Sequence, residues 1–356
     1  SAIAPVFPTV ARELGVAPEA MSLLITVFTL PGIVLAPLLG ILADRFGRKQ
    51  VLVPAVVLFS LAGAACALAP DFQTLLLLRF LQGVGGASLG SLSATLIGDL
   101  FRGHRQVSAM GYNAAMLSVG SAVFPSLGGG LALLAWHLPF ALPVLGLVVA
   151  LAVLFRMEAV EIHRGSSLRS YLGEAWNGMR AGPVLGLYLS SLATFVVLYG
   201  AYTVFIPLHL SAAFGSSALG IGLIMTVGSA ATAITATTLG RLSRRFTRPR
   251  LVITAFALYA LSFVLIPWLP AYGWVALPVA LIGVAQGLNY PVVLSMLALS
   301  ARPEHRGVFL SANGMVLRIG QTLGPVLMAG IAAWGGVEPV FYAAAGICLG
   351  MFLLLP

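Results

Sequence analysis

The sequence has 356 residues, of which 60% are hydrophobic and only 8% are charged, whereas soluble domains average roughly 45–50% apolar and about 25% charged residues. This composition excludes a water-soluble globule and predicts an all-α polytopic membrane protein. The 40 glycines and 21 prolines fit that class, because neighbouring helices in a membrane satisfy the backbone groups that these residues leave free.

Charges and turn residues divide the chain into twelve predicted helices. In chain order they cover residues 1–12, 18–43, 50–69, 73–101, 105–134, 138–156, 183–212, 217–242, 250–269, 272–300, 305–333 and 338–356. The first helix is shorter than the ~20 residues that a span needs. We therefore expect the sequence to open inside its first helix and to stop inside its last, with both natural termini lying beyond it.

The basic residues predict the orientation in the membrane. Of the 19 Lys and Arg residues, all but Arg12, Arg79 and Arg318 fall in alternate loops. The positive-inside rule assigns those loops, and with them both termini of the intact protein, to the cytoplasm. The net charge of +9 is explained by this placement, so we expect no nucleic-acid partner.

One long polar connection divides the chain. Residues 157–182 are predicted to form a cytoplasmic linker, within which 167–180 has the apolar spacing of an amphipathic helix lying at the membrane surface. The linker separates an N-terminal six-helix bundle, residues 1–156, from a C-terminal six-helix bundle, residues 183–356.

The two predicted bundles are copies of each other at an offset close to 200 residues. Residues 40–48 match 240–248, and Gly120 and Pro125 match Gly320 and Pro325. Tandem halves of this kind place a substrate site between them near the bilayer midplane, and rocking of one half against the other exposes that site to each side in turn.

Three motifs carry a resemblance to a known family. Residues 40–49, GILADRFGRK, resemble the signature loop between helices 2 and 3 of the major facilitator superfamily. Residues 79–85 in helix 4 resemble the motif of its proton-coupled members, and 105–143 is most similar to bacterial multidrug exporters. Residues 120–129 in helix 5 are similar to the antiporter signature, with Phe124 where Gly is usual; the matching residues are Gly120, Pro125, Gly128 and Gly129. The resemblance implies a twelve-helix major facilitator fold of two pseudo-symmetric six-helix bundles.

The resemblance also implies a conformational latch. In it Asp44 faces the start of helix 11, near residues 304–307, while Arg48 pairs with Asp99 at the end of helix 4. A carboxylate is favourable at a helix N-terminus, and Gly40 would let helix 2 approach a neighbour closely. A solvated loop that follows the positive-inside rule is the alternative. The second copy has a basic residue in place of the acid, so we expect no equivalent latch there.

Proton coupling has three candidate residues: Arg79, Asp44 and His209. An unpaired arginine in hydrocarbon costs at least ~2.5–3.5 kcal/mol, so Arg79 is expected to face protein or water. The resemblance implies that it lowers the pKa of a nearby carboxylate; a structural role is the alternative. No acid falls near the predicted midplane, which leaves an acid before residue 1 or a boundary group such as Asp44, Asp99 or His209. A histidine has a reference pKa of ~6.5, but His209 would also fit a hydrogen-bonded interface position.

Polar and aromatic residues inside the spans are the candidates for the substrate cavity. They are Tyr112, Asn113, Met116, Tyr199, Tyr202, Phe205, Gln286, Asn289, Tyr290, Asn313 and Arg318. Tyr199, Tyr202 and Phe205 recur every third residue and share a helix face; helix packing is the alternative for this face. Arg318 lies ~20 Å from the start of helix 11, close to midplane. Aromatic walls with few hydrogen-bonding groups suit bulky amphipathic compounds.

The sequence thus predicts a secondary active transporter that exports drug-like small molecules across a bacterial inner membrane in exchange for protons. Its partners are the substrate, protons and membrane lipid, and we expect a monomer. The alternative is a symporter or facilitator of another small solute, including an anionic one; Phe124, the missing midplane acid and the two intramembrane arginines favour it. The 5 histidines are scattered over different loops and the 2 cysteines are far apart, so we expect no enzyme, no metal and no other cofactor.

Overall fold

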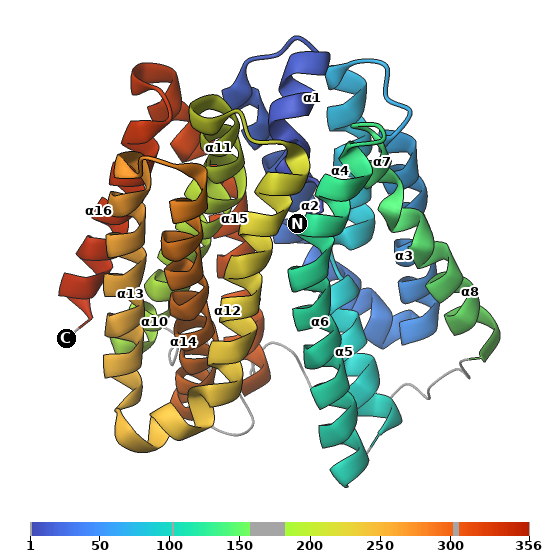
Figure 1. Cartoon of the computed structure of the whole chain (residues 1–356). Helices are drawn as coiled ribbons and strands as arrows, with labels where there is room; N and C mark the ends of the chain where they lie inside the picture. Colours follow the sequence, from blue (N-terminus) through green and yellow to red (C-terminus); the bar gives the residue numbers. More distant parts are fainter. Residues whose placement is uncertain (1, 102, 157–181, 302–305, 356) are drawn as a thin grey trace.

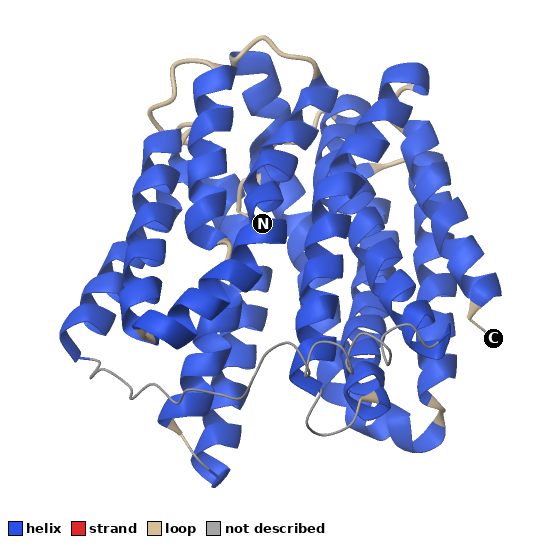
Figure 2. Cartoon of the chain, turned by 180° about the vertical axis from the view of Figure 1, so that it is seen from behind, coloured by secondary structure: helices blue, strands red, loops and turns tan. Residues whose placement is uncertain are grey.

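The structure is a computed structural model that describes residues 2–101, 103–156, 182–301 and 306–355. Within these ranges every regular element is helical and no strand occurs (Figure 2). The predicted amphipathic helix at 167–180 lies outside the described residues.

The first half of the chain contributes eleven short and long helices. They are η1 (Ala4–Val6), α1 (Phe7–Glu13), η2 (Pro18–Ala20), α2 (Met21–Phe46), α3 (Arg48–Cys66), α4 (Phe72–Gly86), α5 (Leu89–Leu100), α6 (Gly103–Ala132), α7 (Leu138–Ala141), η3 (Leu142–Leu145) and α8 (Gly146–Arg156).

The second half begins after the undescribed linker. Its helices are α10 (Gly182–Val197), η4 (Leu198–Phe205), α11 (Ile206–Phe214), α12 (Ala218–Arg245), α13 (Arg248–Leu265), η5 (Ile266–Trp268), η6 (Tyr272–Val275), α14 (Ala276–Ser300), α15 (Arg306–Gly335) and α16 (Glu338–Leu354). Of these, η4 is a π-helix.

The predicted fold class is confirmed. Among the described residues, 10 helical segments are long and apolar enough to cross a membrane. The short η1–α1 segment precedes them and the apolar α16 follows, which gives the predicted order of twelve helices. Two predicted helices are more complex than expected: residues 73–101 divide into α4 and α5 directly after Gly85 and Gly86, which are poor helix formers, and residues 183–212 contain the π-helical turns of η4.

The helices form two groups that stand side by side (Figure 1). One comprises η1 to α8 and the other α10 to α16. We call the end at which α8 finishes and α10 starts the linker end, and the opposite end the far end. Since successive spans run in opposite directions, α2 and α12 finish at the linker end, and α6 and α15 start there.

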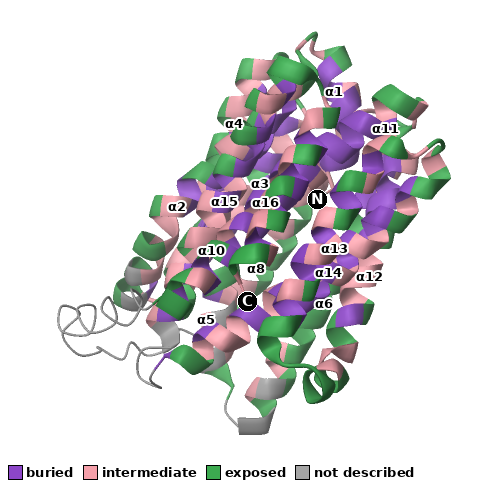
Figure 3. Ribbon diagram, turned by 90° about the vertical axis from the view of Figure 1, so that its left-hand side faces the viewer, coloured by how far each residue is buried: buried purple, intermediate pink, exposed green. Residues whose placement is uncertain are grey.

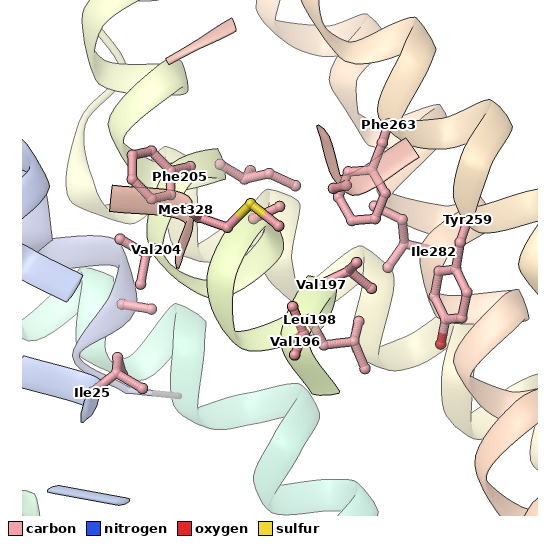
Figure 4. Close-up of a cluster of buried hydrophobic side chains, with 14 of the residues drawn as sticks. Ile25, Val196, Val197, Leu198, Val204, Phe205, Tyr259, Phe263, Ile282 and Met328 are labelled. Atoms are coloured by element: carbon pink, nitrogen blue, oxygen red, sulfur yellow. The ribbon is translucent and has the colours of Figure 1, made fainter. Parts of the chain in front are cut away.

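Apolar side chains fill the interior of the groups and also cover their outer surface. A large cluster through the second half contains Phe205, Tyr259, Phe263 and Met328 (Figure 4). Exposed residues are found along the helices of both groups (Figure 3), and exposed leucines among them include Leu77, Leu151, Leu261 and Leu353. An apolar exterior is the surface that lipid requires, because it exposes no polar group that water would otherwise hydrate.

Two long contacts, which we call the α6–α12 seam and the α2–α15 seam, join the groups. In the α6–α12 seam, a Cβ on Gly129 would meet the carbonyl oxygen of Ala218, and one on Gly222 would meet that of Pro125. These glycines therefore allow the two backbones to touch. The contacts lie toward the far end. Toward the linker end, Tyr112 and Met116 of α6 are 73% and 64% exposed.

Candidate functional site

A cavity of about 340 Å³ lies between the two groups of helices. From the first half it is lined by Ile3, Ile25, Phe28, Arg79, Leu117, Ser118, Ser121 and Pro125. From the second half it is lined by Leu198, Tyr199, Tyr202, Thr203, Met225, Gly228, Ser229, Thr232, Ala233, Ile282, Gly283 and Gln286. Both halves therefore contribute to one shared space, as the internal repeat predicts for a substrate site.

Arg79 of α4 lies in the wall of this cavity. Its Nε donates to the carbonyl oxygen of Leu24 at 3.3 Å, and its Nη1 donates to Oε1 of Gln82 at 2.5 Å. Its guanidinium carbon is 4.4 Å from the centre of the Phe28 ring, a cation–π distance. The side chain is 6% exposed. Arg79 is thus held by a carbonyl, an amide and an aromatic ring, with no carboxylate among its described partners.

Arg318 of α15 lies at the α2–α15 seam. Its Nη1 donates to Oε1 of Gln321 at 3.4 Å. A Cβ built on Gly32 of α2 would stand 3.1 Å from the Arg318 Nε atom, so the absence of a side chain on Gly32 makes room for the guanidinium. Both arginines therefore pair with a glutamine three residues later on the same helix, and both pack against α2.

Hydroxyl groups cross each seam in equivalent positions. The Thr26 hydroxyl donates to the carbonyl oxygen of Thr322 at 3.2 Å, and the Thr226 hydroxyl donates to that of Ala122 at 2.8 Å. Both the donors and the acceptors are related by the repeat offset of 200. The Ser126 hydroxyl completes the second set, 2.6 Å from that of Thr226. These residues were not among the predicted site, although the Thr-Val pair repeated at 26 and 226 could have identified them.

The aromatic stripe predicted on helix 7 is only partly directed into the cavity. Tyr199 and Tyr202 line the cavity, whereas Phe205 is fully buried in the core of the second half. The three-residue spacing assumes an α-helix, but these residues lie in η4, where the Thr203 hydroxyl donates to the carbonyl of Leu198 five residues earlier. All three residues lie in η4, whose π-helical hydrogen bonds differ from the α-helical spacing that the prediction assumed, and Phe205 is the one that packs in the core.

The candidates on α14 and α15 occupy different environments. Gln286 lines the cavity. Tyr290 meets the Phe195 ring edge-on at 5.7 Å, and Phe195 stacks on Tyr199 at 5.8 Å. Tyr290 is therefore linked through Phe195 to Tyr199, which lines the cavity. Asn289 and Asn313 are buried, with amide atoms that have no hydrogen-bond partner among the described residues.

The remaining cavity candidates lie on the linker half of α6. Tyr112 lines a second, shallow hollow of about 380 Å³ with Phe101 and Arg105. Met116 is exposed and Asn113 is half-buried. The structure does not bring these three residues together with the central cavity.

His209 is also separate from the cavity. It lies in α11 near the far end, buried between the rings of Phe214 and Phe341 at 6.0 and 5.3 Å. These are ring contacts, so the proton-coupling role and the hydrogen-bonded interface position of His209 both stay predictions. Among the residues that the structure describes, no group of His, Cys, Asp and Glu could hold a metal ion.

Most residues of the predicted latch lie outside the part of the chain that the structure describes. The side chains of Asp44 and Asp99, like residues 304–305, are not among those described. Arg48 is the first residue of α3. A Cβ on Gly40 would meet no described atom within 4 Å, so the close approach expected there stays a prediction.

The helix 5 motif is better defined. Pro125 lines the cavity. A Cβ on Gly128 would meet the backbone of Ala2, one on Gly129 would meet that of Ala218, and one on Gly120 would meet the Phe124 ring at 3.2 Å. The motif therefore shapes the far part of the interface between the halves.

An apolar exterior, described helical segments long enough to span a membrane and a cavity shared between two groups of helices characterise a multi-pass membrane transporter. The chain belongs to the Major Facilitator Superfamily, whose sequence model matches residues 1–209 and 192–356. The resemblance inferred from the motifs is therefore confirmed, and membership indicates a transporter rather than an enzyme.

Similar proteins lie among bacterial resistance transporters. The chain is 27% identical to the tetracycline resistance protein, class C, of Escherichia coli, over 96% of this chain and 89% of that protein. It is 24% identical to multidrug resistance protein 1 of Bacillus subtilis (strain 168), over 99% and 91%. A solved nucleoside transporter has the same fold, with a TM-score of 0.83 at 12% identity over 99% of this chain and 94% of that chain.

Proposed function

We propose that this protein exports amphipathic, drug-like small molecules across a bacterial inner membrane in exchange for protons. The observation that carries the proposal is the cavity between the halves, whose walls combine Phe28, Tyr199 and Tyr202 with the buried charge of Arg79. Similarity to tetracycline and multidrug resistance proteins over nearly the full chain supports this class of substrate.

The proposed mechanism is rocking of residues 1–156 against 183–356 about the two seams, with 157–182 as the cytoplasmic linker. The positive-inside rule places the linker end, and both termini, in the cytoplasm. Contacts at the far part of the seams and exposed side chains toward the linker end fit an inward-facing state. Opening the far end would require these seam contacts to separate.

Proton coupling is assigned to Arg79, with Asp44 and His209 as further candidates. Arg79 is among the described residues that line the cavity, where it can act on both a proton-carrying group and a substrate. The protein is proposed to work as a monomer.

Transport in proteoliposomes tests the coupling. The full chain is reconstituted, and uptake of tetracycline is measured with an acidic lumen, with no pH gradient, and after a protonophore, against protein-free liposomes. We expect uptake that depends on the acidic lumen. Uptake of equal rate without a gradient would indicate facilitation, and uptake driven by the opposite gradient would indicate symport; either result would overturn antiport.

The latch has a test of its own. Asp44→Asn should shift the protein toward the inward-facing state and slow transport, because it removes a negative charge that a helix N-terminus would stabilise. Such a charge contributes about 0.3–1 kcal/mol. Arg244→Gln, at the equivalent position of the second copy, is the matched control and should leave transport unchanged. Labelling of a cysteine introduced at Tyr112 reports the exposure of the linker side. Equal labelling and transport in Asp44→Asn and wild type would remove the latch.

The second candidate function is symport or facilitated passage of another small solute. Its supporting observation is the cavity lining, in which the described residues include Arg79 but no carboxylate. The direction of the pH dependence in the same proteoliposomes separates the two candidates.

A further inference from the structure

The space between the halves has a positive charge that the described residues do not neutralise. Arg79 lines the cavity, and Arg318 of α15, which is not among the lining residues, packs against Gly32 in the α2–α15 seam. The acids whose side chains the structure describes all lie at helix ends on the far side, namely Glu13, Glu19, Asp71 and Glu338. An arginine inside a membrane protein ordinarily pairs with an acid or faces a water-filled path, so this pair calls for an anion.

The two guanidinium groups keep most of their hydrogen-bonding capacity. An arginine has five N–H donors. The described partners of Arg79 are Leu24 and Gln82, and that of Arg318 is Gln321 at the long distance of 3.4 Å. In both cases the glutamine three residues later orients the guanidinium without changing its charge. The free N–H groups can bind a carboxylate or a similar oxyanion in the two-pronged way that arginine favours.

The internal repeat relates Arg318 to a residue that lines the cavity, although Arg318 itself is not among the lining residues. Its equivalent at the offset of 200 is Ser118, and that of Gln321 is Ser121; both serines line the cavity from α6. Along α2, Arg79 packs against Phe28 and Arg318 against Gly32. These two positions are one helical turn apart, about 6 Å at 1.5 Å per residue.

The rest of the lining suits a ring system. Tyr199, Tyr202 and Met225 face Phe28 and Leu117 across the cavity. Such walls reward burial of an apolar body, while an ammonium group would meet two positive charges in a region of low dielectric constant.

We propose that the cavity selects amphipathic organic anions, with the negative group held between Arg79 and Arg318 and the aromatic part against Tyr199 and Tyr202. The inference rests on the proposed function as a small-molecule transporter and specifies its substrate class. It is independent of whether protons drive the transport.

Three probes with the same ring system test the charge preference: naphthoate, naphthamide and naphthylmethylammonium. Binding to the purified full chain in detergent is measured by the shift in unfolding temperature, and transport by counterflow in proteoliposomes, at constant chloride. We expect naphthoate to bind at least about tenfold tighter than the other two, a difference of about 1.4 kcal/mol.

Substitutions of the two arginines test whether these residues cause the preference for naphthoate. Arg79→Gln and Arg318→Gln should each weaken naphthoate binding by about tenfold or more and leave naphthamide binding nearly unchanged. Arg318→Lys keeps the charge and should retain part of the preference. Arg250→Gln, an exposed arginine at the start of α13, is the matched control and should bind all three probes like the wild type. If Arg79→Gln does not give a monodisperse protein, Arg79→Lys replaces it, and loss of the two-pronged contact should still weaken naphthoate binding.

Equal binding of the three probes, a preference for the ammonium compound, absence of naphthoate binding, or a preference that survives both glutamine substitutions would overturn the inference. These outcomes are distinct from failure of the proposed function, which is decided by the pH dependence of tetracycline uptake. Charge selectivity without proton dependence would keep the inference and reject antiport, and proton-driven uptake without charge selectivity would do the reverse.

Discussion

The two seams that join the halves are related by the internal repeat, yet they are built differently. In the α6–α12 seam, glycines at 129 and 222 bring backbone against backbone. In the α2–α15 seam, the position beside Gly32 is filled by the long side chain of Arg318. Both keep the equivalent threonine-to-carbonyl hydrogen bond. One seam is thus a contact of backbone with backbone, and the other holds the arginine Arg318 between the halves.

The largest effect is expected from extra volume in the α6–α12 seam. Gly129→Ala should destabilise the protein by about 1–3 kcal/mol, because its Cβ would press on the backbone carbonyl of Ala218, which has no rotamer to yield. Gly130→Ala is the matched control, since a Cβ there would meet Leu219 Cδ1 at an ordinary 4.0 Å. Unfolding temperatures of the two purified variants check the prediction, and equal values would contradict a tight backbone contact.

The equivalent threonine-to-carbonyl bonds of the two seams can be compared directly, while the Thr29–Thr322 hydroxyl pair of the α2–α15 seam stays in place. Thr226→Val should cost about 0.5–1.5 kcal/mol, because it removes a 2.8 Å bond to Ala122 and the partner of Ser126. Thr26→Val should cost less, since its bond is 3.2 Å long. Thr254→Val, an exposed threonine that bonds within its own helix, corrects for the substitution itself. A larger loss of stability in Thr26→Val than in Thr226→Val would mean that the threonine bond of the α2–α15 seam is the stronger one.

The same Gly-to-Ala change in the α2–α15 seam should have a much smaller effect on stability. In Gly32→Ala the new Cβ meets the flexible end of Arg318, which can shift, and the helix propensity of Ala offsets the crowding by up to ~1 kcal/mol. We expect an unchanged unfolding temperature and an altered apparent substrate affinity. Gly240→Ala, with no described atom within 4 Å of its Cβ, gains helix propensity without crowding, so it should not lower the unfolding temperature and should leave the substrate affinity unchanged. A loss of stability as large as that of Gly129→Ala would remove the distinction between the seams.

The smallest effect is expected from the N-terminal cap of α4, where the two halves also differ. The backbone N–H of Thr74 donates to Asp71 Oδ1 at 2.8 Å and holds the pKa of this carboxyl below its usual value of 3.8. The resulting stabilisation is fully present above pH 3.8 and is lost as the pH falls through the lower pKa of the folded state. The equivalent position, Ala271, makes no side-chain cap.

Asp71→Ala should therefore lower the unfolding temperature slightly at neutral pH and flatten its decline in acid. Glu13→Ala, which removes an acid from the last turn of α1, should show the same decline of the unfolding temperature in acid as the wild type. The same decline in wild type and Asp71→Ala would show that the cap contributes nothing measurable.

Some site residues could be predicted because their residue type alone is unusual where it stands in the sequence. Arg79 and Arg318 stand out as charges within apolar spans, and both lie between the halves. Phe205 shows where this reasoning stops: its spacing from Tyr202 assumes α-helical geometry, whereas both residues lie in the π-helical η4 and Phe205 is buried in the core. Phe28 was not predicted, because a phenylalanine in an apolar helix looks like any other until Arg79 is found against its ring.

The sequence alone determined the number of spans, their order and the repeat, because in lipid each span must satisfy its own backbone hydrogen bonds and charges and turn residues mark its ends. Only the tertiary structure decided which face of each helix meets the cavity. Lipid and protein interior are both apolar, so the amphipathic pattern that identifies the buried face of a soluble helix is weak here. Pairings such as Thr226 with Ala122 and Arg318 with Gly32 depend on how helices distant in sequence rotate and approach each other.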